Sequence, residues 1–310
     1  MQTPVIFLIF NRPDTTAQVF AEIAKARPRR LLVVADGPRP HRPDDVEKCS
    51  ATRAVIERVD WPCEVSCDFA EENLGGRRRI SSGLTWAFSQ VEAAIVLEDD
   101  CLPHPTFFPF CEELLNRYCH DERIMAITGD NFQFGRSRTK YSYYFSRYFH
   151  SWGWATWRRA WQHYDDTLHM WPEARDNNLL AGLLEDPETL QFWTRMFERR
   201  YRKEVDDGWD YCWIFSCWLQ NGLTITPNVN LVSNIGFRPD ASHTVDPWNP
   251  RANLPTFPME FPLQHPPFVA RHVEADRYIQ KTVFSRPGLG ARVVRKLRWM
   301  VRQYLQNQAP

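Results

Sequence analysis

Three consecutive carboxylates, Glu98-Asp99-Asp100, directly follow the apolar run 93–97. A short run rich in Ile and Val is typical of a buried strand in an α/β sheet, and open α/β sheets bind ligands beyond the carboxyl ends of their strands. Three acids placed there repel one another unless positive charge shares the site. A divalent cation carrying a diphosphate would supply that charge, because hard cations prefer oxygen ligands. A solvated acidic loop with helix-capping roles is the alternative that spacing leaves open.

Two further strand ends carry polar side chains of the right kind. The apolar run 5–10 is followed by Asn11-Arg12, and the run 31–35 is followed by Asp36-Gly37. Because the carboxyl ends of parallel strands meet at one edge of a sheet, these residues and the acidic run are predicted to converge. A nucleotide with a metal-bound diphosphate needs such a set: a carboxylate for base or ribose, a guanidinium for phosphate and an acid for the metal.

The elements that must position these residues alternate between strand and helix signals. Four strand–helix units in a row predict an α/β fold with a mostly parallel, doubly wound sheet flanked by helices. The first half is predicted to contain strands at 5–10, 31–35, 64–69 and 93–97, with helices at 13–26, 44–59 and 78–91. The second half is predicted to contain helices at 105–119, 155–163, 188–203, 209–220 and 270–283, and strands at 124–128, 223–226 and 230–235.

We expect one domain over residues 1–238, with a nucleotide-binding half at about 1–104 and an acceptor half at about 105–238. The stretch 239–267 holds eight prolines, so residues 239–268 are predicted to form an extended segment. Residues 269–310 are predicted to form a helical tail. Its last helix, at about 291–306, combines an apolar stripe with several arginines. Such a helix can lie on an anionic membrane surface, or it can dock on its own domain or on a partner subunit.

Composition excludes several classes of protein. Charged residues make up 25% and hydrophobic residues 43% of the chain, as in ordinary globular proteins. The formal net charge of zero argues against a nucleic-acid-binding protein. Eight cysteines without zinc-type spacing indicate free thiols in a reducing cytosol. The first apolar run is too short for a signal sequence or a membrane span, so we expect a cytoplasmic protein, with peripheral contact at the inner face of the membrane through its tail.

Taken in order, these pieces resemble the nucleotide-sugar glycosyltransferases of the GT-A (Rossmann-like) fold. The resemblance covers roughly residues 4–245, and it is strongest to the N-acetylglucosaminyltransferase I family and to bacterial family-2-like glycosyltransferases. The run 96–100 is similar to that family's Glu-Asp-Asp form of the Asp-X-Asp motif, which implies that Asp100 binds manganese. Arg12 looks like the nucleotide-contacting Arg and Asp36 like the Asp that contacts uridine. Trp152-Gly153-Trp154 is similar to the Gly-Trp segment that lines the donor and acceptor site.

The same resemblance implies a catalytic base. Trp209-Asp210 looks like the Trp-Asp pair whose Asp accepts the acceptor proton, and a single base opposite the leaving group implies inversion at the anomeric carbon. Asp206 and Asp207 are rivals for this role, and an acid at a helix start can instead serve the helix dipole. Ser242-His243 resembles a Ser-His step in a late loop near the site. Gly83 stands where the family has a nucleotide-contacting His.

The function implied is that of a metal-dependent inverting glycosyltransferase of the hexosyl- or N-acetylhexosaminyltransferase class. It would use Mn²⁺ or Mg²⁺ and move a sugar from a nucleotide diphosphate sugar, here a UDP-sugar, to a hydroxyl of a glycan, lipid-linked glycan or polysaccharide precursor. Glu98 and Asp99 would hold ribose, sugar hydroxyls and metal-bound water, and Arg12, Arg77 or Arg78 would contact phosphate. One alternative is a sugar nucleotidyltransferase, although that class favours a Gly-rich loop after the first strand. The other is a non-catalytic carbohydrate-binding protein on the same fold.

Overall fold

A computed structural model describes residues 1–205, 208–237 and 249–284. Three sets of predicted features lie outside these described residues: the rival bases Asp206 and Asp207, the Ser242-His243 step, and the tail helix at 291–306.

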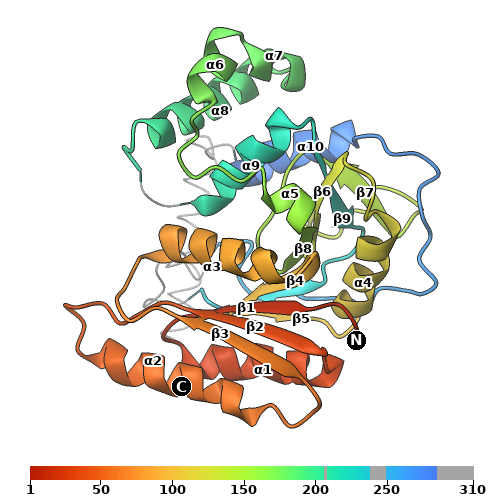
Figure 1. The fold of residues 1–310 in the computed structure, drawn as a ribbon. Coiled ribbons are helices and arrows are strands. Elements are labelled where there is room, and N and C mark those ends of the chain that lie inside the picture. The colour runs from red at the N-terminus through yellow and green to blue at the C-terminus, as the bar shows by residue number, and fades with distance from the viewer. Residues whose placement is uncertain (206–207, 238–248, 285–310) are drawn as a thin grey trace, which may run out of the picture.

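The first half of the chain forms a block of four parallel strands. β1 (Val5–Ile9), β2 (Arg30–Ala35), β3 (Glu64–Phe69) and β4 (Ala93–Glu98) are arranged in the order β3-β2-β1-β4. In the register, Val5 lies opposite Leu31 on one side and Ile95 on the other. Figure 1 shows α1 (Pro13–Ala26) and α2 (Asp44–Ala54) on one face of this block and α3 (Gly76–Gln90) on the other. Both faces are therefore covered, which explains why β1, β2 and β4 are continuous apolar runs, whereas the edge strand β3 is largely exposed.

The second half extends the same sheet to eight strands. Beyond β4 come β8 (Trp154–Trp157), β6 (Ile124–Thr128), β9 (Leu223–Pro227) and β7 (Tyr143–Ser146). β8 and β7 run antiparallel to their neighbours, whereas β6 and β9 are parallel to each other. A separate antiparallel pair joins β5 (Cys101–Pro103) to β10 (Val232–Asn234). The predicted α/β fold with a mostly parallel, doubly wound sheet flanked by helices is confirmed.

The aromatic region differs from the expected pattern. A helix is predicted at 155–163, but residues 154–157 form β8, and the helix that follows, α5 (Arg158–Trp161), has only four residues. All four residues of β8 are buried between β4 and β6. Aromatic and β-branched residues suit such a buried strand, and a short apolar run does not distinguish a helix from a strand by periodicity.

The remaining helices enclose the second half. Figure 1 shows α6, α7 and α8 together at the end of the molecule away from α1 and α2. None of the helices in the described ranges has the length and apolar character needed to cross a bilayer. The helices of the second half are α4 (Phe107–Arg117), α6 (Trp171–Asp176), α7 (Leu179–Leu183), α8 (Pro187–Tyr201), α9 (Trp209–Leu219), α10 (Val273–Ile279) and η2 (Gln280–Phe284). In the first half, η1 (Val55–Arg58) directly follows α2.

An aromatic cluster fixes the start of α9 against β8. The ring centroids of Trp154 and Trp209 are 5.6 Å apart, and those of Trp161 and Trp213 are 5.2 Å apart. All four side chains are buried. Because large rings in such a cluster interlock and contribute strongly to core energetics, the first turn of α9 is held in a defined position relative to the sheet.

The proline-rich segment is partly anchored where the structure describes it. Met259 and Leu263 are buried in the hydrophobic core. The Met259 amide donates to Thr106 Oγ1 at 2.9 Å, and the Phe257 amide donates to the Asn230 carbonyl at 2.8 Å. Residues 254–264 therefore follow the protein surface beside α4 in an irregular conformation.

Candidate active site

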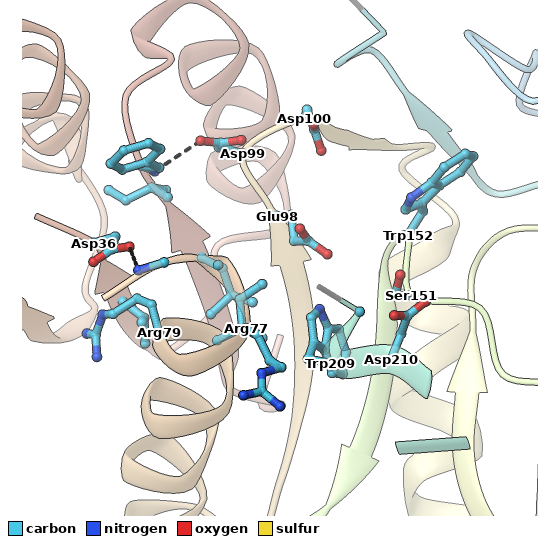
Figure 2. Close-up of a pocket in the computed structure, with 18 of the residues that line it drawn as sticks. Asp36, Arg77, Arg79, Glu98, Asp99, Asp100, Ser151, Trp152, Trp209 and Asp210 are labelled. Carbon is cyan, nitrogen blue, oxygen red and sulfur yellow. Dashed lines mark hydrogen bonds between the residues drawn. The ribbon is translucent and has the colours of Figure 1, made fainter. Parts of the chain in front are cut away.

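A cavity of about 500 Å³ lies at the carboxyl ends of β1, β2 and β4. The starts of α3 and α9 also contribute to its lining. Figure 2 shows Asp36 and Arg79 on one side, Glu98, Asp99 and Asp100 in the middle, and Trp152 and Asp210 on the other side. The structure thus brings most of the predicted site residues to one cavity, namely Arg12, Asp36, Glu98, Asp99, Asp100, Trp152 and Asp210.

The acidic run is crowded and largely removed from water. Glu98 ends β4, and Asp99 and Asp100 form the turn that leads into β5. Asp99 Oδ2 accepts a hydrogen bond from the Phe10 amide at 3.0 Å. Burial, reinforced by the charge of Asp100, raises the pKa of Asp99 to about 7. Burial and the neighbouring carboxylates, Asp210 among them, also raise the pKa of Glu98. This site accumulates negative charge that an added cation would relieve.

Arg12 supplies positive charge to the acids. Its Nη1 donates to Asp100 Oδ2 at 2.6 Å and lies 3.7 Å from Asp99 Oδ1. Arg12 directly precedes α1, so β1 and α1 together fix its position. On the Asp100 side, Gly236 lies so close that a Cβ at this position would collide with the Asp100 carboxylate. The guanidinium expected to contact phosphate therefore faces the acid expected to bind the metal.

Asp36 has a different environment from the one expected. Its carboxylate accepts four hydrogen bonds at 2.8–3.0 Å, from the amides of Gly37, Leu74 and Gly75 and from the side chain of Asn73. A carboxylate offers about four acceptor positions, so these bonds occupy them. Instead of presenting free oxygens to a nucleobase, Asp36 holds the loop that leads into α3.

Two cavity-lining arginines on this side also have protein partners. Arg79 donates to the Ala35 carbonyl at 3.0 Å and lies 2.8 Å from an Asp68 oxygen. Arg39 makes a two-pronged contact with Asp45, with one hydrogen bond of 2.9 Å. The Arg39 hydrogen bonds lower the pKa of Asp45 to about 2. Neither arginine was predicted from the sequence as a site residue, because arginines in loops and at helix starts are usually solvated.

Gly83 has a packing role in α3. A Cβ at this position would collide with the Val34 side chain on β2. The helix therefore lies directly on the strand, and a histidine has no room there. Ile80, one turn earlier in α3, lines the cavity, so an apolar side chain is presented on this side of the site.

Asp210 lies in the first turn of α9, and Gly208 with a φ of 82° precedes the helix. Figure 2 shows Asp210 and Trp209 on the far side of Glu98 from Asp36. Its charge contributes to the raised pKa of Glu98, so the two carboxylates are within electrostatic reach. An acid in the first turn also interacts favourably with the helix dipole, and that role is compatible with a place in the cavity.

The segment Trp152-Gly153-Trp154 divides between the cavity and the core. Trp152 lines the cavity together with Ser151. Trp154 is fully buried, with its ring centroid 4.9 Å from that of Phe149. Gly153 has a φ of 66°, and its carbonyl accepts from the Gly129 amide at 2.7 Å. All three residues are predicted to line the site, but Gly153 and Trp154 pack the interior, because the positive φ of Gly153 turns the chain between Trp152 and the start of β8 at Trp154.

Arg200 and Tyr211 line the cavity beside Asp210, and neither was predicted from the sequence. The Arg200 guanidinium lies 3.9 Å from the centre of the Tyr211 ring, and the side chain is buried. Arg200 follows Glu198 and Arg199 near the end of α8. A charged run of this kind is typical of a solvated helix face, so only the fold reveals that Arg200 faces inward.

The donor chemistry of the acids fits a cation bound together with a diphosphate. Within the described ranges, no three His, Cys, Asp or Glu residues are grouped so that they could hold a metal ion alone. Mg²⁺ usually binds through one or two carboxylates plus substrate phosphates rather than through an all-protein cage. Asp100 and Asp99 provide hard oxygen donors of that kind at the cavity.

No protein-family model matches the sequence, and no similar curated protein was found. Among solved structures, the chain is similar to mannosyltransferase PcManGT from Pyrobaculum calidifontis, in complex with GDP-Man and Mn²⁺, with 16% identity and a TM-score of 0.37. That likeness covers 51% of this chain and 46% of the mannosyltransferase, so the chain matches less than half of that protein's length.

Two further solved structures are of other enzymes. A 4-diphosphocytidyl-2C-methyl-D-erythritol synthase from Anaerococcus prevotii has 8% identity and a TM-score of 0.38, covering 72% of this chain and 88% of that chain. A UDP-glucose pyrophosphorylase complexed with UDP-glucose has 13% identity and a TM-score of 0.27, covering 47% and 62%. Each likeness is partial.

Proposed function

We propose that this protein is a metal-dependent inverting glycosyltransferase that uses a nucleotide diphosphate sugar, with UDP-sugars as the first donors to test. Its acceptor would be a hydroxyl of a glycan, lipid-linked glycan or polysaccharide precursor. One observation carries the proposal: Asp100 and Asp210 line the same cavity, with Glu98 between the nucleotide side and the Asp210 side.

The donor would lie across the middle of the cavity. Its nucleoside would occupy the side near Phe10, Asn73 and Ile80, which combines an aromatic ring, an amide and an apolar side chain. Its diphosphate would face Arg12, whose guanidinium can bond phosphate oxygens in two-pronged fashion. A volume of about 500 Å³ is in the usual range for small-molecule sites.

Asp100 would hold the divalent cation, Mn²⁺ or Mg²⁺, together with the diphosphate. Bound there, the cation supplies Lewis-acid stabilisation of the charge that develops on the leaving group. Arg12, already 2.6 Å from Asp100, would share its hydrogen bonds between that acid and the phosphates. Glu98 and Asp99 would hold ribose or sugar hydroxyls and water around the cation.

Asp210 would accept the proton of the attacking hydroxyl as general base. It stands at the start of a helix that the aromatic cluster fixes in place, and a fixed base favours attack from one direction. Because the base would act from the side opposite the leaving group, the transfer would invert the anomeric configuration.

A panel of nucleotide sugars, each with and without Mn²⁺, tests the proposal by thermal shift and product analysis. We expect at least one donor to raise the melting temperature only with metal, and slow release of nucleoside diphosphate from it. Release of pyrophosphate from a nucleoside triphosphate and a sugar phosphate would instead identify a nucleotidyltransferase. Binding without turnover would identify a carbohydrate-binding protein.

A further inference from the structure

Arg251 lies beside the cavity and holds its guanidinium against two aromatic rings. The guanidinium carbon is 5.6 Å from the centre of the Trp152 ring and 5.9 Å from the centre of the Phe132 ring. Its Nε donates to Asn249 Oδ1, two residues away, at 3.3 Å. No carboxylate or carbonyl of the described residues accepts a hydrogen bond from Nη1 or Nη2 of Arg251.

Three arginines that line the cavity differ in this respect. Arg12 pairs with Asp100, Arg39 pairs with Asp45, and Arg79 contacts Asp68. The planar guanidinium is suited to binding two oxygens of one carboxylate or phosphate at once. Arg251 therefore presents guanidinium N–H donors next to the site. In Arg12, Arg39 and Arg79, by contrast, such donors contact the carboxylates of aspartates.

The electrostatic surroundings place Arg251 on the Asp210 side. Burial lowers the pKa of Arg251, while the charges of Asp130 and Asp210 partly oppose that effect. His150 is buried nearby, and burial lowers its pKa to about 3, so it carries no charge at neutral pH. Arg251 is partly exposed, so an anionic ligand can reach its guanidinium from the solvent side and form charge-assisted hydrogen bonds with it.

The rings beneath Arg251 form an apolar platform. Trp152 lines the cavity, and Phe132 packs edge-on against it at 5.2 Å between centroids. Aromatic faces suit the C–H face of a sugar ring. A sugar resting on Trp152 would bring an acidic substituent within reach of Arg251 and its hydroxyls toward Asp210.

We propose that Arg251 and Trp152 form an acceptor subsite for a sugar that carries an oxyanion, either a carboxylate or a phosphate ester. The inference rests on the proposed function in one respect: it assigns the Asp210 end of the cavity to the acceptor. It deepens that function by naming the acceptor as an acidic glycan or phosphoglycan.

Calorimetric binding without donor tests the subsite. The probes are methyl β-D-glucuronide for the carboxylate, glucose 6-phosphate for the phosphate ester and methyl β-D-glucoside as the neutral sugar. Because charge-assisted hydrogen bonds contribute about 1.5–3 kcal/mol, we expect one acidic probe to bind wild type about tenfold or more tightly than the glucoside. Arg251→Gln should abolish this preference. Arg123→Gln should retain it, because Arg123 directly precedes β6 at the amino end of that strand, which runs parallel to β4, whereas the cavity lies at the carboxyl ends.

The outcome also distinguishes a carboxylate from a phosphate ester, and the acceptor subsite from the glycosyltransferase function. The acidic probe that binds more tightly identifies the substituent. Equal binding of all three sugars to wild type, or a preference that persists in Arg251→Gln, would overturn the subsite. If Arg251→Gln does not fold, Arg251→Lys replaces it, because lysine keeps the charge and loses the fork; an undiminished preference there is equally negative. An anion preference in a protein that binds no nucleotide sugar would reject the glycosyltransferase proposal alone.

Discussion

At the scale of single residues, Asp100 would have two competing positive partners under the proposed function, Arg12 and the cation. In the protein alone, Arg12 is 2.6 Å away and supplies one positive charge to a cavity that also contains Glu98, Asp99 and Asp210. A cation arriving with a donor diphosphate would bring more charge to the same oxygens. Metal and donor should therefore bind together.

Replacing Asp100 tests that dependence. We expect Asp100→Asn to weaken Mn²⁺-dependent donor binding about 100-fold or more, since a metal ligand contributes at least as much as its supporting residues. Titration of donor with and without EDTA measures the effect, and the melting temperature checks the fold. Donor affinity that depends on Mn²⁺ as strongly in the variant as in wild type would remove Asp100 from the metal site.

Asp210 should behave in the opposite manner. Asp210→Asn keeps the size of the side chain and removes the base, so we expect turnover to fall about 10²–10⁴-fold while donor affinity stays within a few-fold of wild type. Single-turnover transfer and donor titration measure the two quantities. Turnover near the wild-type rate would move the base to another residue.

Asp130 is a buried acid whose neighbours indicate that it is protonated. Thr128 Oγ1 lies 2.6 Å from Asp130 Oδ1 and 2.8 Å from the His150 carbonyl. The hydroxyl has one proton and the carbonyl can only accept, so the two contacts are both satisfied when the carboxyl group donates to Thr128. Burial also raises the pKa of Asp130 to about 8.

The raised pKa of Asp130 gives a signed prediction for stability. Below pH 4 the carboxyl group is protonated in both states, and between about pH 4 and 8 only the unfolded state loses the proton. The free energy of unfolding should therefore fall with rising pH, by at most about 1.4 kcal/mol per unit from this group. Asp130→Asn, whose amide can donate to Thr128, should lack this component. Urea unfolding across this range would show wild type and variant diverging; parallel curves would mean that Asp130 is ionised when folded.

At the scale of elements, α3 connects sheet packing to the nucleotide side of the cavity. Gly83 lets the helix lie against Val34, and Ile80 on the same helix faces the site. The distance between α3 and β2 therefore affects both the core and the cavity wall.

A pair of glycine substitutions tests this contact. Gly83→Ala forces a Cβ into Val34, so we expect it to lower the free energy of unfolding by about 1–3 kcal/mol. Gly182→Ala in α7 meets no atom within 4 Å, and alanine favours helix, so it should be neutral or stabilising by up to about 1 kcal/mol. Chemical denaturation compares them. Equal effects of the two substitutions would show that the contact is looser than described.

Elements with strong patterns were predictable from the sequence, and those that depend on distant partners were not. The runs that form β1, β2, β4 and β6 are apolar on both faces, which marks buried strands directly. β8 and β7 lie in an aromatic stretch where helix and strand patterns look alike. Their strand conformation depends on pairing with distant strands, β8 with β4 and β6, and β7 with β9. The acidic run was predictable because three adjacent carboxylates are unusual, whereas the inward turn of Arg200 depends on how α8 packs.

At the scale of the whole molecule, the eight-stranded sheet and the elements that border it place the proposed donor and acceptor residues around one cavity. The parallel block provides the acids and the nucleotide side, and α9 and the segment before β8 provide Asp210 and Trp152. The cavity therefore lies at the junction of the two halves.

The basic tail gives a prediction for the molecule as a whole. Residues 289–310 lie outside the described ranges, and their sequence combines an apolar stripe with arginines. Removing them should reduce cosedimentation with anionic vesicles, since such helices bind anionic lipid. Neutral vesicles serve as the control. Equal sedimentation of both forms would indicate that the tail covers the protein's own surface or a partner subunit.

The four hydrogen bonds that Asp36 accepts have a consequence for the energetics of recognition. They keep the backbone at 73–75 in shape before any donor arrives, so this wall need not be ordered at the moment of association. Calorimetry should then record a heat-capacity change no larger than the buried ligand surface accounts for. In Asp36→Ala, residues 73–75 would have to become ordered when the donor binds, and this ordering would add to the heat-capacity change of binding.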